Sequence, residues 1–461
     1  MPRINKFFII TLVLVILTVS AVLRYRNFAV VPLPGESTDE YSNTWVGLSL
    51  IQLGRPVGRS GLEGYKGTDF RYINVDGIFS TTAGGNPLGI NQPWLDHPPL
   101  LPLITGSYAY ISGARVFEDA TARIIRKPML VMGVFTVALV GYLSYQIFGT
   151  GAALMVMALY ATSPLMVVTS RMVQGENGVI IGFLLALIFL YKYLTKNRLI
   201  YLWLAALSAG LAVLFKVSGV SVIICGLFVL LTQENKKLAE KFREAALFLI
   251  VSGSFLALYF VYGAAFGWST FMEVWSSNST RPYDIGFGSL FDLLTVTKIT
   301  ISKRLTEGWP LMGWVSLFVL MKTKSKKIFS FVVLPTFVYL SVFLLMGGNS
   351  YGWYRIPFMP FLFLAGGALL AKGYRSKEKL LPLFLTLFPL GVTVHKLNEI
   401  SPLSFLTPYW RMFLPITILW FLTVRNVRTN RLIYLALISV AIGANIFLAY
   451  SLTPGVWLKM N

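Results

Sequence analysis

The sequence contains one cysteine, Cys225, and two histidines in 461 residues. A single thiol excludes a disulfide framework within the chain, and so few Cys and His residues exclude a metal cluster built from them. Charge is also scarce, because Asp, Glu, Lys and Arg make up 13% of the chain, against about 25% in soluble domains. This scarcity excludes an ordinary soluble protein and a disordered chain.

Apolar residues make up 56% of the sequence, aromatic residues 15%, and the mean hydropathy is +0.68. About thirteen apolar segments come near the ~20 residues that a helix needs to cross a membrane. They cover residues 7–23, 124–147, 151–169, 178–194, 199–215, 217–232, 244–265, 309–321, 328–346, 356–371, 380–394, 410–424 and 432–452. The predicted fold class is an all-α integral membrane protein of about thirteen spans.

The net charge of +21 indicates a membrane topology rather than a nucleic-acid partner. With the N-terminus inside, the cytosolic loops are 192–198, 233–243, 322–327, 372–379 and 425–431. These loops and the N-terminus hold 20 of the 40 Lys and Arg residues, and only four of the 19 acids lie in or next to them. Basic residues gather on the cytosolic side of membrane proteins. The sequence therefore predicts a multi-pass plasma-membrane protein with its N-terminus inside and a lipid bilayer as partner.

The first span, 7–23, also has the basic start and small residues of a cleaved signal peptide, but the many later spans favour a retained helix. The segment 24–123 that follows is the first outer loop and holds nine of the 19 acids. A second large outer loop covers 266–308. Long loops of this kind carry functional residues more often than short connections do.

Two parts of the first outer loop are informative. The segment 38–53 predicts a helix lying on the membrane surface, with Ser37 or Thr38 as a cap and Asp39 and Glu40 in its first turn. Further on, Pro98 and Pro99 fix the chain just before a second helix begins. Such a rigid entry would hold the preceding His97 at a site.

These residues belong to an ordered set of motifs. The set comprises Asp39-Glu40, His97-Pro98-Pro99-Leu100, Ala122-Arg123, Ser170-Arg171 with Glu176, Gly210-Leu211-Ala212 with Lys216, and Tyr354-Arg355 with Pro357 and Pro360. On these motifs the chain resembles the C-type glycosyltransferase superfamily (GT-C). It looks most like the dolichyl-phosphate-mannose–protein mannosyltransferase-related group, glycosyltransferase family 39. The chain departs from that group at Glu176, where Asp is usual.

The resemblance implies a GT-C-like catalytic module over 1–371 and additional transmembrane helices over 372–461. It implies an enzyme that moves a sugar from a polyprenyl-phosphate donor to a hydroxyl of a protein, lipid or envelope glycan. The site would lie on the periplasmic or extracellular side, and one displacement would invert the anomeric centre. No cofactor is required, although a divalent metal held by a histidine and an acid stays an alternative.

Three residues are the predicted catalytic group. Asp39 would remove the acceptor proton, Glu40 would orient Asp39 or raise its pKa by like-charge proximity, and His97 would hydrogen-bond the donor or acceptor. Simpler roles stay open, since an acid in a first helical turn stabilises the helix dipole and a loop histidine can serve packing alone. Asp96, Glu176 and Tyr354 are predicted to shape the site, with Glu176 pairing with Arg171 or polarising the site.

Four cations are predicted to bind the donor phosphate, because charges at helix ends in a membrane need a reason to be there. They are Lys216, Arg355, Arg123 and Arg171. Snorkelling to the interface is the simpler alternative for Lys216 and Arg355. For Arg126 and Lys127, contact with lipid headgroups is an equally good alternative to phosphate binding.

The second outer loop offers aromatic and polar side chains that could stack on a sugar, or form an aromatic belt. They are Trp268, Trp275, Arg281, Tyr283, Asp284 and Trp309. Two other functions stay open, a transporter or flippase for a lipid-linked glycan and a scaffold subunit of an envelope assembly. A transporter usually carries internal repeats and charges along a midplane path. No repeat is evident here, and the acids gather in one outer loop, so the enzyme is favoured.

Overall fold

The computed structural model describes residues 6–37, 39–65, 69–73, 88–279, 298–300, 303–345, 351–375, 379–400, 407–424 and 426–460. Four residues considered above lie outside these ranges, namely Thr38, Arg281, Tyr283 and Asp284.

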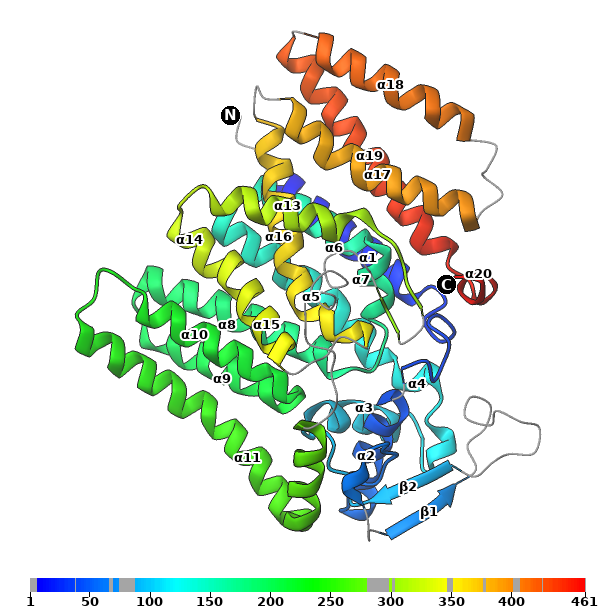
Figure 1. The fold of residues 1–461 in the computed structure, drawn as a ribbon, viewed down its shortest axis with the longest axis vertical. Coiled ribbons are helices and arrows are strands. Elements are labelled where there is room, and N and C mark those ends of the chain that lie inside the picture. Colours follow the sequence, from blue (N-terminus) through cyan, green and yellow to red (C-terminus); the bar gives the residue numbers. More distant parts are fainter. Residues whose placement is uncertain are drawn as a thin grey trace.

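Helices make up most of the described chain (Figure 1). The first half contains α1 (Lys6–Tyr25), α2 (Asp39–Leu53), α3 (Leu100–Ile111), α4 (Ala122–Ile125), α5 (Lys127–Phe148), α6 (Thr150–Thr162), α7 (Pro164–Thr169), α8 (Gly175–Lys196), α9 (Leu199–Phe215) and α10 (Val220–Leu231). The second half contains α11 (Leu238–Ser279), α13 (Gly308–Met321), α14 (Lys326–Ile328), α15 (Leu334–Leu345), α16 (Met359–Gly373), α17 (Leu380–Ile400), α18 (Thr407–Thr423), α19 (Val427–Ser451) and α20 (Pro454–Lys459).

Shorter elements connect these helices. They are the 3-10 turns η1 (Glu63–Tyr65), η2 (Phe117–Asp119), η3 (Val217–Gly219) and η5 (Gly352–Phe358), and the π-helical turn η4 (Phe329–Val333). One antiparallel hairpin joins β1 (Asp69–Ile73) to β2 (Leu88–Gln92), with Asp69 opposite Gln92 and Ile73 opposite Leu88. The hairpin lies beside α2 and α3, at the opposite end of the molecule from α18 (Figure 1).

Helices occupy all thirteen segments that the sequence predicted to cross a membrane. Within the described ranges, seven helices are long and apolar enough to span one by themselves. They are Lys6–Tyr25, Ala122–Phe148, Gly175–Lys196, Leu238–Ser279, Gly352–Gly373, Leu380–Leu397 and Val427–Ser451. The prediction of a mostly helical membrane protein is therefore confirmed, while the count of thirteen spans and the inside N-terminus stay predictions.

The helix predicted over 38–53 is present as α2 and is largely buried within the protein, while its position at the membrane surface stays a prediction. Every residue from Glu40 to Ser49 is buried. The reason is a backbone-to-backbone contact with α3, because a Cβ at Gly47 would lie 1.8 Å from the carbonyl oxygen of Pro102. Two helices can approach this closely only where side chains are missing, so α3 covers this face of α2, whereas Ile51 and Leu53 at its end stay exposed.

The C-terminal helices α17, α18 and α19 form a group at one end of the molecule (Figure 1). The residues that follow α19 contact the start of the first outer loop. The Trp457 Nε1 donates to Glu36 Oε2 at 2.7 Å, and Asn27 Nδ2 donates to the Leu452 carbonyl at 2.9 Å. The predicted division between 371 and 372 stays a prediction, but the last residues help to hold the loop that precedes α2.

Candidate active site

The carboxylate of Asp39, at the start of α2, lies beside the imidazole of His97. The distance from Asp39 Oδ2 to His97 Nε2 is 3.8 Å, and the side chains are 32% and 22% exposed. This separation is longer than a direct hydrogen bond, and both side chains are open to solvent in part. The structure thus brings together two of the three predicted catalytic residues.

The loop that carries His97 is fixed from several sides. The Trp94 and His97 rings meet edge to face, with centroids 5.7 Å apart. The Leu95 amide donates to the Tyr65 hydroxyl at 2.7 Å, and the Tyr259 hydroxyl of α11 donates to the Leu95 carbonyl at 3.2 Å. These contacts from η1 and α11 give the loop the rigid placement that its prolines suggested.

Asp96 is held by hydroxyl groups rather than by a cation. The Ser60 Oγ donates to Asp96 Oδ2 at 2.7 Å, and the Tyr65 hydroxyl donates to Oδ1. Burial raises the pKa of Asp96 to about 6, against the lowering effects of His97 and of the two hydroxyl donors. The prediction that Asp96 shapes the site is consistent with its place under the His97 loop.

Glu40 lies in an environment opposite to that of Asp39. Its carboxylate forms a two-pronged ion pair with the Arg126 guanidinium, in which Nη2 donates to Oε2 at 2.8 Å and Nε donates to Oε1. Both side chains are completely buried. Arg126 Nη1 also donates to the carbonyls of Phe28 and Pro32, both at 2.8 Å.

These contacts correct two predictions. Glu40 is ion-paired with Arg126, so it is not the unpaired like charge that was expected beside Asp39, while a role in orienting Asp39 stays a prediction. Arg126 does not contact lipid headgroups because its guanidinium is enclosed by protein.

Arg171 also differs from its prediction as a phosphate ligand. Its guanidinium is fully buried and donates to the carbonyls of Leu23, Arg24 and Val31 at 2.6, 3.2 and 3.0 Å. Because all three nitrogens are engaged with backbone carbonyls, Arg171 is a structural cation that holds the chain after α1. It does not pair with Glu176 either.

Glu176 pairs instead with Lys216. The Lys216 Nζ lies 2.5 Å from Glu176 Oε1 and 4.4 Å from the centre of the Tyr354 ring. This contact depends on Gly175, where a Cβ would lie 2.6 Å from the Phe215 carbonyl oxygen, so the start of α8 can reach the end of α9. Three predicted residues, from α8, α9 and η5, thus converge.

The other two predicted phosphate ligands are placed differently. Arg355 follows Tyr354 in η5 and is 2% exposed. Arg123 lies in α4 with its side chain exposed, and none of the described contacts joins it to Lys216, Glu176 or Tyr354. Arg355 therefore adjoins the residue whose ring Lys216 contacts, whereas the described contacts give Arg123 no such link.

Contacts link the Asp39 group to the Lys216 group. The Gln174 amide donates to the Ser37 hydroxyl just before α2, and Asn43 Nδ2 donates to the Val173 carbonyl at 3.2 Å. On the other side, Val217 packs against the cluster that contains Leu95. Asp39, His97, Lys216 and Tyr354 are therefore held in one connected region at the end of the helices.

Several positioning residues escaped the sequence analysis. Tyr65, Ser60 and Tyr259 fix Asp96 and His97 although no motif marks them, and only their position in or beside the outer loops hints at a role. The second outer loop gives a mixed result. Trp268 and Trp275 join an aromatic cluster on α11, whereas Trp309 is 4% exposed and belongs to the core. Trp309 therefore serves neither as a sugar platform nor as an interfacial belt.

No group of three or more His, Cys, Asp or Glu residues that could hold a metal ion occurs within the described ranges. The described residues therefore provide no preformed set of metal ligands. Whether a divalent metal takes part stays open, and adding a chelator to the activity assay would test it.

Known protein families and solved structures that are similar to this chain are of the kind that the sequence motifs indicated. Residues 96–262, which begin at Asp96 and include Glu176 and Lys216, match the family model described as dolichyl-phosphate-mannose-protein mannosyltransferase. The structure of ArnT from Cupriavidus metallidurans bound to undecaprenyl phosphate aligns with 98% of this chain and 77% of that chain. The identity is 14% and the TM-score 0.57. The fold is of the GT-C type.

A second GT-C structure supports this conclusion. The archaeal oligosaccharyltransferase AglB from Archaeoglobus fulgidus, in complex with an inhibitory peptide and a dolichol-phosphate, aligns with 97% of this chain at 11% identity and a TM-score of 0.56. This chain spans 56% of AglB. No curated protein matches by sequence. The predicted resemblance to the GT-C superfamily is confirmed, and it establishes the fold.

Proposed function

We propose that this protein is a membrane glycosyltransferase that moves a sugar from a polyprenyl-phosphate donor to a hydroxyl acceptor. The observation on which the proposal rests is that a partly exposed carboxylate, Asp39, and a lysine held by two neighbours, Lys216, lie in the same region. Asp39 lies 3.8 Å from His97, and Lys216 is held between Glu176 and Tyr354 in the same connected region. The GT-C fold and the family match over 96–262 support this chemistry.

Asp39 would activate the acceptor. Its carboxylate would take the proton of the acceptor hydroxyl while the hydroxyl oxygen attacks the anomeric carbon. The bond from that carbon to the phosphate oxygen breaks, and polyprenyl phosphate leaves. A single displacement inverts the anomeric centre and needs no second nucleophilic carboxylate. His97 would orient the acceptor or the sugar beside Asp39.

Lys216 and Arg355 would bind the phosphate of the donor. An ammonium group has three donors, and Glu176 engages one of them, so Lys216 retains donors for phosphate oxygens. Cations at this position neutralise charge that develops on the leaving phosphate. ArnT and AglB, with which the fold agrees, are described in complex with undecaprenyl phosphate and dolichol-phosphate, and this supports a lipid-phosphate donor.

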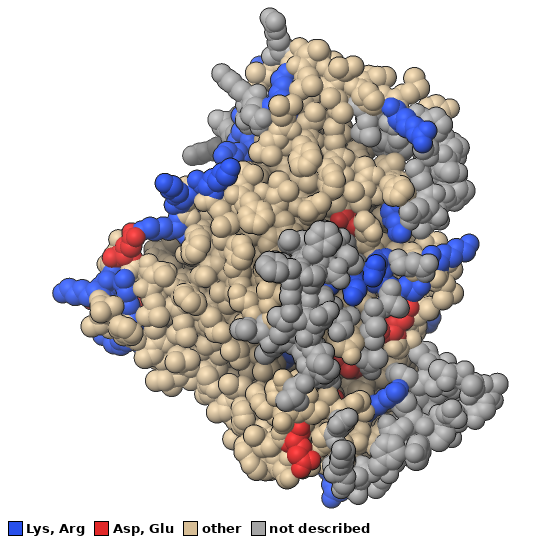
Figure 2. Space-filling model, viewed as in Figure 1, with Lys and Arg blue, Asp and Glu red and all other residues tan. Residues whose placement is uncertain are grey.

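We place the site on the periplasmic or extracellular face of the plasma membrane. Lys and Arg form a row along the edge of the molecule where the α10–α11 and α13–α14 connections lie, away from α2 and α3 (Figures 1 and 2). Basic residues favour the cytosolic side, so this row supports an inside N-terminus and an outward-facing Asp39. The acceptor class, whether protein, lipid or envelope glycan, is part of the question that the experiment answers.

The test uses purified protein in detergent with a panel of labelled polyprenyl-phosphate sugars and mixed envelope acceptors. Release of polyprenyl phosphate is followed for the wild type, for Asp39→Asn and for Glu118→Gln. Glu118 is an exposed acid in the same outer loop and serves as a matched control. We expect Asp39→Asn to lose about 10²- to 10⁴-fold in turnover, and Glu118→Gln to behave as the wild type.

The donor that supports release identifies the sugar, and the labelled product identifies the acceptor. Equal turnover by the wild type and Asp39→Asn would remove Asp39 as the base. Donor binding without release in any acceptor mixture would refute the transferase and favour the transporter or flippase. Unchanged turnover after chelation would exclude the divalent metal.

A further inference from the structure

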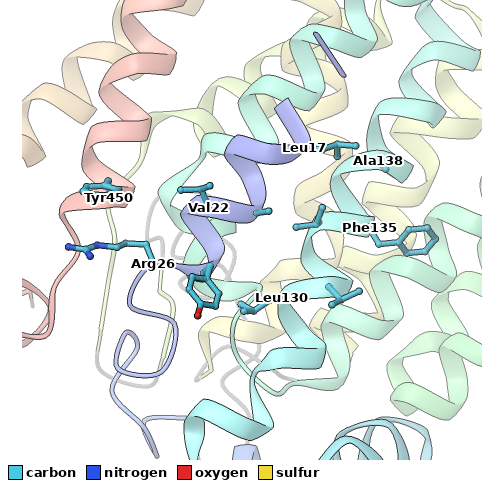
Figure 3. A pocket seen from close by; sticks show the side chains of 11 residues that line it. Leu17, Val22, Arg26, Leu130, Phe135, Ala138 and Tyr450 are labelled. Atoms are coloured by element: carbon cyan, nitrogen blue, oxygen red, sulfur yellow. The ribbon is translucent and has the colours of Figure 1, made fainter. Parts of the chain in front are cut away.

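An open apolar groove lies between α1, α5 and α19 (Figure 3). Its volume is about 860 Å³. Leu17 and Val22 of α1 line one wall, Leu130 and Phe135 of α5 line the other, and Tyr450 of α19 closes one side. Nearly every lining side chain is apolar, which suits the tail of a lipid.

The groove is separate from the candidate active site. It is lined by the face of α5 opposite to the face that packs into the protein. The inner face of α5 carries buried Met129 and Gly133, and Gly133 packs against Arg24 and Ser170. The positions that line the groove, such as Leu130 and Phe135, lie on the other side of the helix. Glu176, the partner of Lys216, belongs to α8, and no α8 residue lines the groove.

One end of the groove is positively charged. Arg26 belongs to its lining, and the guanidinium lies 4.7 Å from the centre of the Tyr450 ring. Lys127 precedes Leu130 and Val131 by three and four residues, so it lies on the groove face of α5, one turn beyond the apolar wall. Both cations are exposed, and no acid within the described ranges forms an ion pair with either.

The length of the groove limits the ligand. Its lining on α5 runs from Leu130 to Ala138, which at 1.5 Å per residue is about 12 Å. This is less than half of the ~30 Å hydrocarbon core. The charged end lies on the side of the molecule that carries the candidate site, because Arg26 directly follows α1 and Lys127 begins α5, and the segment between them carries Asp39 and His97.

We propose that this groove binds a membrane lipid with a net negative phosphate headgroup, from the leaflet that faces the candidate site. The tail lies along Leu17, Val22, Leu130 and Phe135, and the phosphate is held by Arg26 and Lys127. An apolar trough with two exposed cations at one end is what a phosphate-headed lipid requires. This lipid is additional to the donor, whose phosphate belongs with Lys216.

The test measures lipid binding directly, without turnover. Purified protein in detergent is titrated with dioleoyl phosphatidylglycerol or with dioleoyl phosphatidylcholine, and bound lipid is counted by native mass spectrometry. We expect the wild type to prefer phosphatidylglycerol. The double variant Arg26→Gln/Lys127→Gln should lose affinity for that lipid by about fivefold per cation, roughly 25-fold in total. Its affinity for phosphatidylcholine should change much less.

Two further variants test whether binding depends on these two cations and on the groove. Lys237→Gln/Arg243→Gln removes one exposed Lys and one exposed Arg elsewhere and should bind phosphatidylglycerol as the wild type does. Val134→Trp fills the groove without changing charge and should weaken the binding of both lipids. Equal losses in the two charge variants would refute a specific site, and full binding by Val134→Trp would refute the groove.

The outcome is distinguishable from that of the proposed function. Arg26→Gln/Lys127→Gln should still bind the polyprenyl-phosphate donor as the wild type does, because Lys216 and Arg355 are untouched. Loss of donor binding in this double variant would show that the groove is the donor site and would overturn the proposal of a second lipid. Failure of the transferase assay would leave the lipid titration unaffected.

Discussion

Asp39 and Glu40 are adjacent in sequence, yet their carboxylates lie in opposite environments. Asp39 is 32% exposed beside His97, whereas Glu40 is completely buried against Arg126. Successive side chains of a helix diverge by about 100°, so one acid can face the site while its neighbour faces the core. The buried acid anchors the first turn of α2, and this anchor fixes where the exposed acid points.

The pair formed by Glu40 and Arg126 should control the stability of the fold. Removing one partner of a buried ion pair typically costs about 3–5 kcal/mol, because the other charge is left without compensation. We expect Arg126→Met and Glu40→Gln each to lower the thermal unfolding temperature strongly in detergent. Glu118→Gln should leave it unchanged. An unfolding temperature for Arg126→Met equal to that of the wild type would contradict the anchoring role.

Lys216 should control the affinity for the donor. A hydrogen bond to a charged group contributes about 1.5–3 kcal/mol, so Lys216→Met should raise the KM for the polyprenyl-phosphate sugar by roughly 10- to 100-fold. Since Lys216→Met leaves Glu176 without its cation, the double variant Lys216→Met/Glu176→Gln separates this effect from instability. If the double variant folds and keeps the wild-type KM, the donor phosphate binds elsewhere.

The close approach of α2 and α3 should tolerate no side chain at Gly47. A Cβ there would lie 1.8 Å from the Pro102 carbonyl oxygen, so Gly47→Ala must push the helices apart. Overpacking of this kind costs about 1–3 kcal/mol, and we expect a lower unfolding temperature and slower turnover, because α2 carries Asp39. Gly253→Ala is the matched control, since a Cβ in α11 at that position meets nothing within 4 Å. Equal effects of the two substitutions would refute the tight contact.

Asp96 should make stability depend on pH. Burial raises its pKa to about 6 from an ordinary value near 3.8, so the native state binds this proton more tightly than the unfolded chain does. The contribution of Asp96 to stability is then largest at low pH and decreases as the pH rises through the window between these two values. We expect the unfolding temperature of the wild type, relative to Asp96→Asn, to fall between about pH 4 and pH 6. A difference that does not change with pH would contradict the raised pKa of Asp96.

Much of the fold follows from local features of the sequence. Runs of apolar residues mark helices because a membrane span must satisfy its own backbone hydrogen bonds, whichever helices surround it. All thirteen predicted segments are helical, and the ordered motifs from Asp39 to Tyr354 identified the GT-C type. The helix over 38–53 and the loop at His97 were also found in this way.

The partners of the charged residues could not be found from such features. Glu40 and Arg126 are 86 positions apart, and Glu176 and Lys216 are 40 apart. The sequence analysis paired Glu176 with the nearby Arg171, and the structure assigned Arg171 to the carbonyls of Leu23, Arg24 and Val31 instead. A buried charge must be compensated by whatever group the packing brings to it, and sequence distance gives no measure of that.

The sequence by itself determined that this protein is a helical membrane protein, which segments form its helices, and which motifs mark its fold as GT-C. Composition and hydrophobic runs suffice for this because the bilayer acts on each segment separately. Only the tertiary structure decided that Asp39 faces His97 while Glu40 anchors α2, that Lys216 is caged by Glu176 and Tyr354, and that Arg26 and Lys127 cap a groove. These outcomes depend on how closely helices approach, and that distance is set by contacts such as Gly47 on Pro102 between segments far apart in the chain.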